Sequence, residues 1–228
     1  MIYKIYYQKR MDINTQISKT PTELCFIMDY FGSDKGDPEG KKNHTYTRFY
    51  HELFKPVRDR PIRLFELGLG TNNVNIPSNM GADGKPGASL RGWKQFFPNG
   101  EIFGADIDRD ILFQESRINT FYCDQNSPVI TREMWGNAGL VDDGMDIIID
   151  DAYHVFSYNV NFFQNSNYKL NLGGIFIIED IMHYTLDLWK EKISQWEQQY
   201  PHLRFRLYVI PYEKNPYDNT LLIVQRVE

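Results

Sequence analysis

The sequence predicts an α/β protein whose mostly parallel sheet ends in an antiparallel hairpin, and three observations carry this prediction. From residue 63 onward, short apolar runs alternate with segments of helical periodicity, which is typical of a parallel sheet with helices on both faces. The first apolar run passes directly into a Gly-x-Gly turn. The last two runs, Leu203–Tyr212 and Thr220–Val227, are joined by a segment rich in Asn, Pro and Asp, which indicates a hairpin.

Length and composition limit the classes of protein to which the chain can belong. Its 228 residues suit one α/β domain with additions, and the net charge of −5 without a long basic run disfavours a nucleic-acid partner. No run approaches the roughly 18 apolar residues of a membrane span. The two cysteines form no disulfide pattern, and the opening segment lacks the features of a secretory signal. We therefore expect a cytoplasmic protein.

Residues 1–60 are expected to form an arm and helices that cover the ligand-binding side of the core, where any cofactor and substrate would lie. The spacing of apolar residues predicts helices over Thr22–Phe31 and Thr45–Phe54. Residues 1–19 show no firm periodicity, so the sequence leaves open whether they form an arm or a contact within a homo-oligomer.

The core over residues 61–228 is expected to contain a seven-stranded sheet, with five parallel strands and the two strands of the hairpin. The long loop Thr71–Gly87 is predicted to be a lid, because loops of this length in compact domains are usually functional or disordered. Strands are predicted over Arg63–Leu67, Glu101–Asp106, Thr120–Asp124, Met145–Asp150 and Gly174–Glu179, and helices over Ala88–Phe97, Pro128–Gly136, Tyr158–Tyr168 and Leu186–Tyr200.

The turn after the first strand favours a ligand that is not a dinucleotide. The strand ends near Glu66, and Gly68 and Gly70 follow. Glycine lets the backbone approach a ligand closely, because no Cβ stands in the way. No third glycine follows at the spacing that binds a pyrophosphate, since Asn72 and Asn73 come next.

Acids follow all five parallel strands, at the edge of the sheet where ligands bind in open α/β folds. One such acid is commonly a helix cap, but five in succession indicate a site. Asp106 ends the second strand, where a carboxylate can accept both ribose hydroxyls of a nucleoside. Asp124 and Gln125 follow the third strand and are expected beside the base of that nucleoside, an adenine.

The fourth and fifth strands end in the pairs Asp150-Asp151 and Glu179-Asp180. Because these strands are expected to be neighbours, Asp151, Glu179 and Asp180 are predicted to converge. Carboxylates so placed repel one another unless they are protonated or bridged by a cation. Oxygen ligands at this density suit Mg²⁺, with Mn²⁺ as an alternative. His154 follows Asp151 closely and is predicted to reach the same place.

These motifs resemble the class I S-adenosylmethionine-dependent methyltransferases. They are most similar to the metal-dependent O-methyltransferases that modify macrolide sugars, the mycinamicin type. The resemblance covers roughly residues 33–180 and departs in length, because the large amino-terminal domain of some relatives has no counterpart. It rests on the Gly-x-Gly turn and on the segments Ser33–Lys35, His44–Tyr50, Gly87–Lys94, Asp151–His154 and Ile177–Asp180.

The resemblance implies a Rossmann-like fold and methyl transfer to a hydroxyl of a sugar or glycoside small molecule. The implied cofactors are S-adenosylmethionine and Mg²⁺. The predicted catalytic residues are His154, as general base, and Asp151; the predicted metal ligands are Asp151, Glu179 and Asp180; the predicted cofactor-binding residues are Tyr46, Glu66, Gly68, Gly70, Ser89, Asp106, Asp124, Gln125 and Asp150.

Two alternatives stay open. A nucleotide-dependent oxidoreductase on a similar sheet would bind a nicotinamide dinucleotide more tightly than adenosylhomocysteine. A cofactor-binding scaffold without catalysis would show neither methyl transfer nor metal dependence, although mutually repelling carboxylates at one edge argue against it. Lys35 is a candidate contact for a carboxylate of cofactor or substrate, with a solvated surface charge as the equal alternative.

Overall fold

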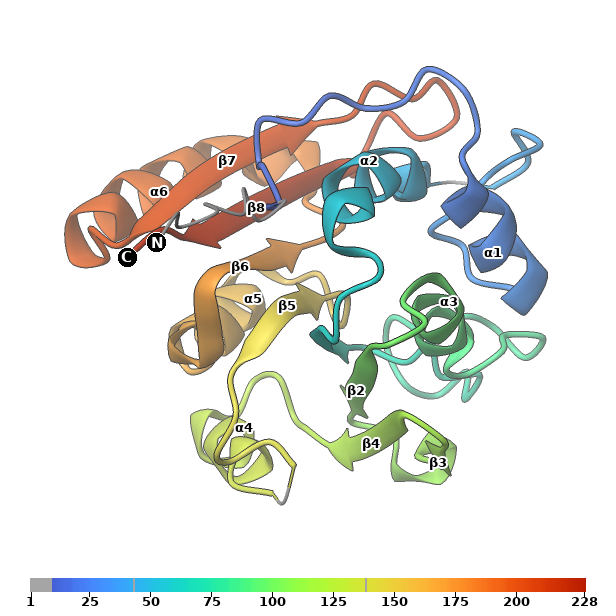
Figure 1. Cartoon of the computed structure of the whole chain (residues 1–228), viewed down its shortest axis with the longest axis horizontal. Coiled ribbons are helices and arrows are strands. Elements are labelled where there is room, and N and C mark those ends of the chain that lie inside the picture. The colour runs from blue at the N-terminus through green and yellow to red at the C-terminus, as the bar shows by residue number, and fades with distance from the viewer. Residues whose placement is uncertain (1–9, 43, 138) are drawn as a thin grey trace, which may run out of the picture.

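One mixed sheet organises the protein (Figure 1). The computed structural model describes residues 10–42, 44–137 and 139–228. Within these residues the strands are β1 (Arg63–Leu67), β2 (Glu101–Asp106), β3 (Gln114–Glu115), β4 (Ile118–Tyr122), β5 (Met145–Asp150), β6 (Leu170–Ile178), β7 (Leu203–Val209) and β8 (Thr220–Arg226).

The strand order β3-β4-β2-β1-β5-β6-β8-β7 confirms the predicted fold class. Strands β4, β2, β1, β5 and β6 are parallel, and β8 and then β7 join them as an antiparallel hairpin. From β1 the strand order runs outward in both directions, through β2 and β4 to one edge and through β5 and β6 to the other. Open α/β sheets bind ligands at such a switch point. The eighth strand, β3, is a two-residue edge strand that pairs with β4 and is too short to leave an alternating pattern in the sequence.

The helices form two layers, one on each face of the sheet. Successive side chains of β1 enter opposite layers, since Leu64 packs with α1, α2 and α3 whereas Phe65 packs with α4, α5 and α6. The four tryptophans are buried in these layers, as expected of packing residues. The helices are α1 (Glu23–Phe31), α2 (Tyr46–Phe54), α3 (Ala88–Phe96), α4 (Pro128–Trp135), α5 (Phe156–Gln164) and α6 (Leu186–Gln199), with short 3₁₀ turns η1 (Lys55–Val57), η2 (Arg109–Ile111), η3 (Asn167–Lys169) and η4 (His183–Thr185).

The largest differences from the predicted boundaries lie between β5 and β6. Helix α5 begins two residues before the predicted Tyr158 and ends at Gln164, and β6 begins at Leu170 instead of Gly174. Gly173 has a left-handed backbone and, with Gly174, gives this segment the composition of a loop. Pairing of Leu170 with Met145, followed by a bulge, nevertheless draws it into the sheet.

The described part of the amino-terminal arm is attached to the hairpin. Met11 and Ile13 are buried against the core, and Gln225 Nε2 donates to the Met11 carbonyl at 2.9 Å. Residues 1–9 lie outside the described residues, so the oligomer contact considered for them stays a prediction. The division of the chain near residue 60 also stays a prediction, since α1 and α2 share an apolar layer with α3.

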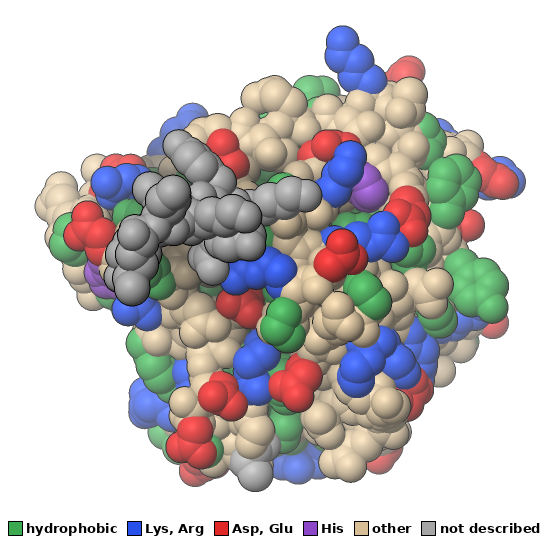
Figure 2. Space-filling view, in the orientation of Figure 1, with side chains coloured by type: hydrophobic (Ala, Val, Ile, Leu, Met, Phe, Trp, Pro, Cys, Tyr) green, Lys and Arg blue, Asp and Glu red, His purple; other side chains and the backbone are tan. Residues whose placement is uncertain are grey.

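The surface shows no single-sign field on the face drawn in Figure 2, where Lys and Arg side chains are interspersed with Asp and Glu. Among the described helices, none combines the length and apolarity required to cross a membrane.

The aromatic packing of α5 gives a test of the fold. The Phe163 ring lies 4.2 Å from that of Trp196 and 5.2 Å from that of Phe176, centroid to centroid. We expect Phe163→Ala to lower the free energy of unfolding by about 3–5 kcal/mol, because it leaves a cavity in a buried cluster. Leu172→Ala is the control, since this side chain is 71% exposed and its loss should matter by less than about 0.5 kcal/mol. Urea unfolding measures both, and equal effects would contradict the packing described.

Candidate functional site

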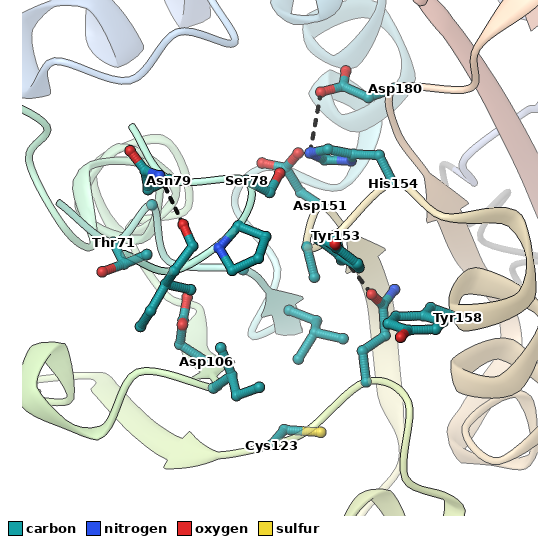
Figure 3. A pocket seen from close by; sticks show the side chains of 18 of the residues that line it. Thr71, Ser78, Asn79, Asp106, Cys123, Asp151, Tyr153, His154, Tyr158 and Asp180 are labelled. Atoms are coloured by element: carbon teal, nitrogen blue, oxygen red, sulfur yellow. Dashed lines mark hydrogen bonds and ion pairs between the residues drawn. The ribbon is translucent and has the colours of Figure 1, made fainter. Parts of the chain in front are cut away.

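A cavity of about 450 Å³ opens at the carboxyl ends of the parallel strands (Figure 3). Its volume is within the range of small-molecule sites. The turn after β1, the ends of the other parallel strands and the loop after the glycine turn form its walls. The predicted site residues that line it are Gly68, Gly70, Asp106, Asp124, Gln125, Asp151, His154 and Asp180.

The glycine turn is tied directly to the end of β5. The Gly68 amide donates to the Ala105 carbonyl and the Asp151 amide to the Leu67 carbonyl, each at 2.9 Å. Gly68 has φ of +94°, and a Cβ at this position would lie 2.0 Å from the Asp151 carbonyl oxygen. Only glycine therefore permits this approach of β1 to β5.

The loop after the turn borders the cavity, and it is anchored at both ends. Ser78 and Asn79 face the cavity from this loop (Figure 3). The Met80 amide donates to the Thr71 carbonyl at 2.8 Å, and the Gly87 amide donates to the Leu69 carbonyl at 2.7 Å. The position agrees with that expected of a lid, whereas opening and closing stay a prediction.

Asp106 is held against the turn by backbone donors. Its Oδ2 accepts from the Leu69 amide at 2.7 Å and its Oδ1 from the Asp108 amide at 2.9 Å. Burial raises the pKa of this carboxyl, and the two amides act in the opposite direction. Next along the edge, Gln125 Oε1 accepts from the Tyr153 amide at 3.2 Å, which joins the ends of β4 and β5.

Two predicted cofactor-binding acids lie behind the cavity instead of lining it. Glu66 is fully buried and accepts hydrogen bonds from Ser89 Oγ and Trp93 Nε1. Asp150 is also fully buried and accepts from Gln125 Nε2 at 2.7 Å and from Asn159 Nδ2 at 3.0 Å. Burial raises the pKa of the Asp150 carboxyl to about 6. Because side chains alternate along a strand, acids inside β1 and β5 point into the helix layers.

The two remaining predicted cofactor residues also lie outside the wall of this cavity. Ser89 lines a smaller adjoining cavity of about 40 Å³. Tyr46 is buried and donates from its hydroxyl to Asp180 Oδ1 at 2.6 Å. Both residues therefore contact the acids of the site, and Tyr46 holds Asp180 in place.

Asp151, His154 and Asp180 form a group that could hold a metal ion. Each offers one ligand atom, and these atoms lie within 4.8 Å of one another; His154 Nε2 is 3.6 Å from Asp180 Oδ2 (Figure 3). His154 and Asp180 have φ of +58° and +54°, in the left-handed region that non-glycine residues rarely adopt. Such backbone conformations cluster at functional sites. Two carboxylates and an imidazole facing a cavity fit a divalent cation.

Glu179 differs from the predicted arrangement, because it does not join this group. It is buried, its Oε2 accepts from Lys35 Nζ at 2.8 Å, and its Oε1 accepts from the Tyr50 hydroxyl at 2.7 Å. Lys35 Nζ also donates to Asp151 Oδ2. Of the three predicted metal ligands, Asp151 and Asp180 thus converge, whereas an ammonium group stands between Asp151 and Glu179.

Lys35 contacts carboxylates of the protein itself, and it is buried, so it is not a solvated surface charge. A contact of Lys35 with a carboxylate of cofactor or substrate stays a prediction. Burial lowers the pKa of its ammonium, yet the charges of Asp151, Glu179 and Glu66 outweigh burial and raise that pKa well above its usual value. Sequence reasoning missed these partners and also missed His44, whose Nδ1 lies 3.4 Å from Asp180 Oδ1. The only signal was that both residues lie in the segments that support the family resemblance.

No family model matches the chain. The chain is 34% identical over 138 residues to the 8-demethyl-8-alpha-L-rhamnosyl tetracenomycin-C 2'-O-methyltransferase of Streptomyces olivaceus, which covers 60% of this chain and 33% of that protein. It is 32% identical, again over 138 residues, to the mycinamicin VI 2''-O-methyltransferase of Micromonospora griseorubida, with 60% and 32% covered. The chain thus spans about one third of the length of these relatives.

The solved structure of MycE methyltransferase from the mycinamycin biosynthetic pathway, in complex with Mg, SAH and mycinamycin VI, superposes with a TM-score of 0.68. The match has 24% identity and covers 92% of this chain and 56% of that one. This chain has the class I methyltransferase fold. The class I methyltransferase fold accounts for the antiparallel hairpin beside β6, which a plain dinucleotide fold would more often replace with another βαβ unit.

The contact between Gly68 and Asp151 can be tested with a matched pair of variants. Gly40 and Gly68 both have positive φ, but a Cβ at Gly40 would have no atom within 4 Å. Both Gly40→Ala and Gly68→Ala should incur the left-handed backbone strain of about 1–2 kcal/mol. We expect a clearly larger loss of unfolding free energy for Gly68→Ala, because its methyl group also meets the Asp151 backbone. Equal losses in denaturant titrations would contradict this close approach.

Proposed function

We propose that the protein is an S-adenosylmethionine-dependent O-methyltransferase that acts on a hydroxyl of a sugar or sugar-bearing small molecule with the help of a divalent ion. The observation that carries the proposal is a single cavity that borders both the glycine turn and the group of Asp151, His154 and Asp180. The sequence similarity to sugar O-methyltransferases supports the class of acceptor.

The methyl donor is proposed to lie between the glycine turn and the loop Thr71–Gly87. S-Adenosylmethionine supplies a methyl group activated by its sulfonium. Asp106 would accept hydrogen bonds from the ribose hydroxyls, and Asp124 and Gln125 would face the adenine, since all three line the cavity. The amino-acid end would lie beside the turn at Gly68 and Gly70, which both line the cavity. Glu66, Ser89, Asp150 and Tyr46 would act indirectly, by holding the walls of the cavity and the acids beside it.

The divalent ion is proposed to bind at Asp151 and Asp180, with Glu179 as a further ligand. A bound Mg²⁺ would lower the pKa of an acceptor hydroxyl and orient it. Asp151 and Asp180 keep part of their side chains open to the cavity, with 21% and 14% exposed. Vicinal hydroxyls of a sugar chelate such an ion well, which favours a sugar acceptor. The solved MycE complex contains Mg, whereas Mn²⁺ stays an alternative on chemical grounds alone.

His154 is proposed to be the general base that takes the proton of the acceptor hydroxyl. It lines the cavity, and Asp180 Oδ2, 3.6 Å from its Nε2, would orient the imidazole and stabilise its charge after proton transfer. Proton transfer of this kind typically contributes about 10²–10⁴-fold in rate. The side chains around the cavity would supply much of the rest by holding donor and acceptor in line.

The proposed reaction is tested with labelled methyl donor and a panel of free sugars, nucleotide-activated sugars and glycosides. We expect label transfer to at least one hydroxylated acceptor, loss of transfer with a chelator, and recovery with Mg²⁺. Calorimetry with adenosylhomocysteine and with nicotinamide dinucleotides runs beside it. Tighter binding of a dinucleotide would contradict the proposal and support an oxidoreductase.

Asp151→Asn separates the chemistry from donor binding. We expect turnover to be lost, because the variant removes a charged ligand of the ion, while affinity for adenosylhomocysteine stays nearly unchanged. Asp142→Asn, at an exposed position outside the cavity, is the control that removes the same charge. Undiminished turnover in Asp151→Asn would refute the metal assignment.

His154→Asn distinguishes two possible roles of His154, general base and ligand of the ion. Asparagine is chosen because it tolerates a positive φ. We expect turnover to fall by about 10²–10⁴-fold, with Mg²⁺ affinity retained in calorimetry. A parallel loss of Mg²⁺ affinity would instead make His154 a ligand of the ion.

A further inference from the structure

Lys35 lies inside an acidic cluster, and its side chain is only 2% exposed. The cluster consists of Glu66, Asp151, Glu179 and Asp180. The Lys35 ammonium donates to Asp151 Oδ2 and to Glu179 Oε2, and it lies 3.8 Å from Glu66 Oε1. Lys35 comes from the segment between α1 and α2, whereas the three acids come from β1 and from the ends of β5 and β6. One positive charge therefore bridges three neighbouring strands of the sheet.

The ammonium uses the oxygens that a divalent ion would need. Glu179 has its two oxygens engaged by Lys35 and by the Tyr50 hydroxyl. Asp151 accepts from Lys35 at Oδ2 and also belongs to the group with His154 and Asp180. An ion that bound Asp151 and Glu179 together would have to replace Lys35 at both of them.

Lys35 has a second carboxylate within reach. Glu66 is fully buried, and its Oε1 lies 3.8 Å from the ammonium. Lys35, Glu66's partner Ser89 and Asp151 border the cavity of about 40 Å³, which gives the flexible lysine side chain room to move. The ammonium can thus give up two acids without leaving the protein interior or losing all of its charge partners.

The buried carboxylates of the cluster need a positively charged partner even when no metal ion is bound. Glu66, Asp151, Glu179 and Asp180 are crowded together, and the first and third are at most 1% exposed. A buried carboxylate without a partner is strongly destabilising. The other basic groups that face the cluster are imidazoles, His44 and His154, and both of them face Asp180. Among the described residues, Lys35 is therefore the only lysine or arginine in contact with Glu66 and Glu179.

We propose that Lys35 is a tethered cation that competes with the divalent ion for Asp151 and Glu179. It holds the two acids together in the ion-free protein and shifts toward Glu66 when the ion binds. The inference rests on the proposed function, from which it takes the metal site. Its consequence is that the empty site stays folded, at the expense of affinity for the ion.

Lys35→Met tests the competition, because methionine keeps much of the length of the side chain and removes the charge. Mg²⁺ binding is measured by calorimetry without donor or acceptor, and thermal unfolding with and without Mg²⁺. We expect Lys35→Met to unfold at a lower temperature without Mg²⁺, to bind Mg²⁺ about tenfold more tightly because the competing state is removed, and to recover most of the lost stability when Mg²⁺ is added.

Lys42→Met is the matched control. Lys42 lies in the same segment and donates to the Ser33 carbonyl and to Asp29, without contact to the cluster. Its loss removes the same charge and should leave Mg²⁺ affinity as in the parent protein. A similar gain of affinity in both variants would indicate a general field effect and would overturn direct competition.

Lys35→Arg keeps the proposal testable if Lys35→Met does not fold. The guanidinium retains the charge and holds two carboxylates in a rigid fork, so it should give way less easily and weaken Mg²⁺ binding relative to the parent. Mg²⁺ affinity in Lys35→Met equal to or below that of the parent, or affinity in Lys35→Arg equal to or above it, overturns the inference.

Absence of Mg²⁺ binding in every protein overturns the inference together with the metal site. Binding without methyl transfer to any acceptor refutes only the proposed reaction, and the order of the affinities still supports or overturns the competition.

Discussion

Carboxylates from neighbouring parallel strands meet at one edge of the sheet, and their mutual repulsion is the constraint on which the site depends. Parallel strands aligned by their hydrogen bonds end together, so the acids after β5 and β6 cannot avoid each other. One ammonium and two phenols donate hydrogen bonds to Glu179 and Asp180, and two imidazoles lie close to Asp180. The folded site depends on these contacts to the acids.

The same constraint explains why the amino-terminal helices pack where they do. Most of the groups that offset the acids come from the segment between residues 35 and 50. Tyr46 and Tyr50 are buried phenols whose pKa is raised by burial and by the neighbouring carboxylates, so both stay protonated and donate. The cover over the sheet is thus fixed by polar contacts at the site as well as by its apolar layer.

The sequence was most informative where one local rule decides the structure. The bounds of β1, β2 and β5 were predicted correctly, because each is an apolar run ended by an acid or a glycine. The placement of Asp106 and Asp151 at one cavity followed from sheet topology alone. The start of β6 was wrong, since pairing with β5 overrides the loop-like composition around Gly173.

Contacts between distant segments lay beyond such rules. Lys35 meets acids that follow it by 116 and 144 residues, and nothing in the spacing of the sequence fixes which of several lysines does so. Whether the Glu66 and Asp150 side chains point toward the cavity or into a helix layer depends on the exact register of β1 and β5. The sequence indicates the existence of a strand more clearly than it indicates that register. The sequence therefore indicated which residues form the site better than it indicated which side chains they contact.

The contact of Gly68 with the backbone of Asp151 also has a mechanical consequence. It leaves no slack between the glycine turn and Asp151 at the end of β5, so a displacement of either backbone is transmitted to the other. In the proposed reaction, the loop beyond Thr71 would rearrange to admit or release small molecules while the distance between the donor side and the acceptor side stays fixed. The spacing that the proposed transfer needs is thus built into the peptide chain itself, before either reactant arrives.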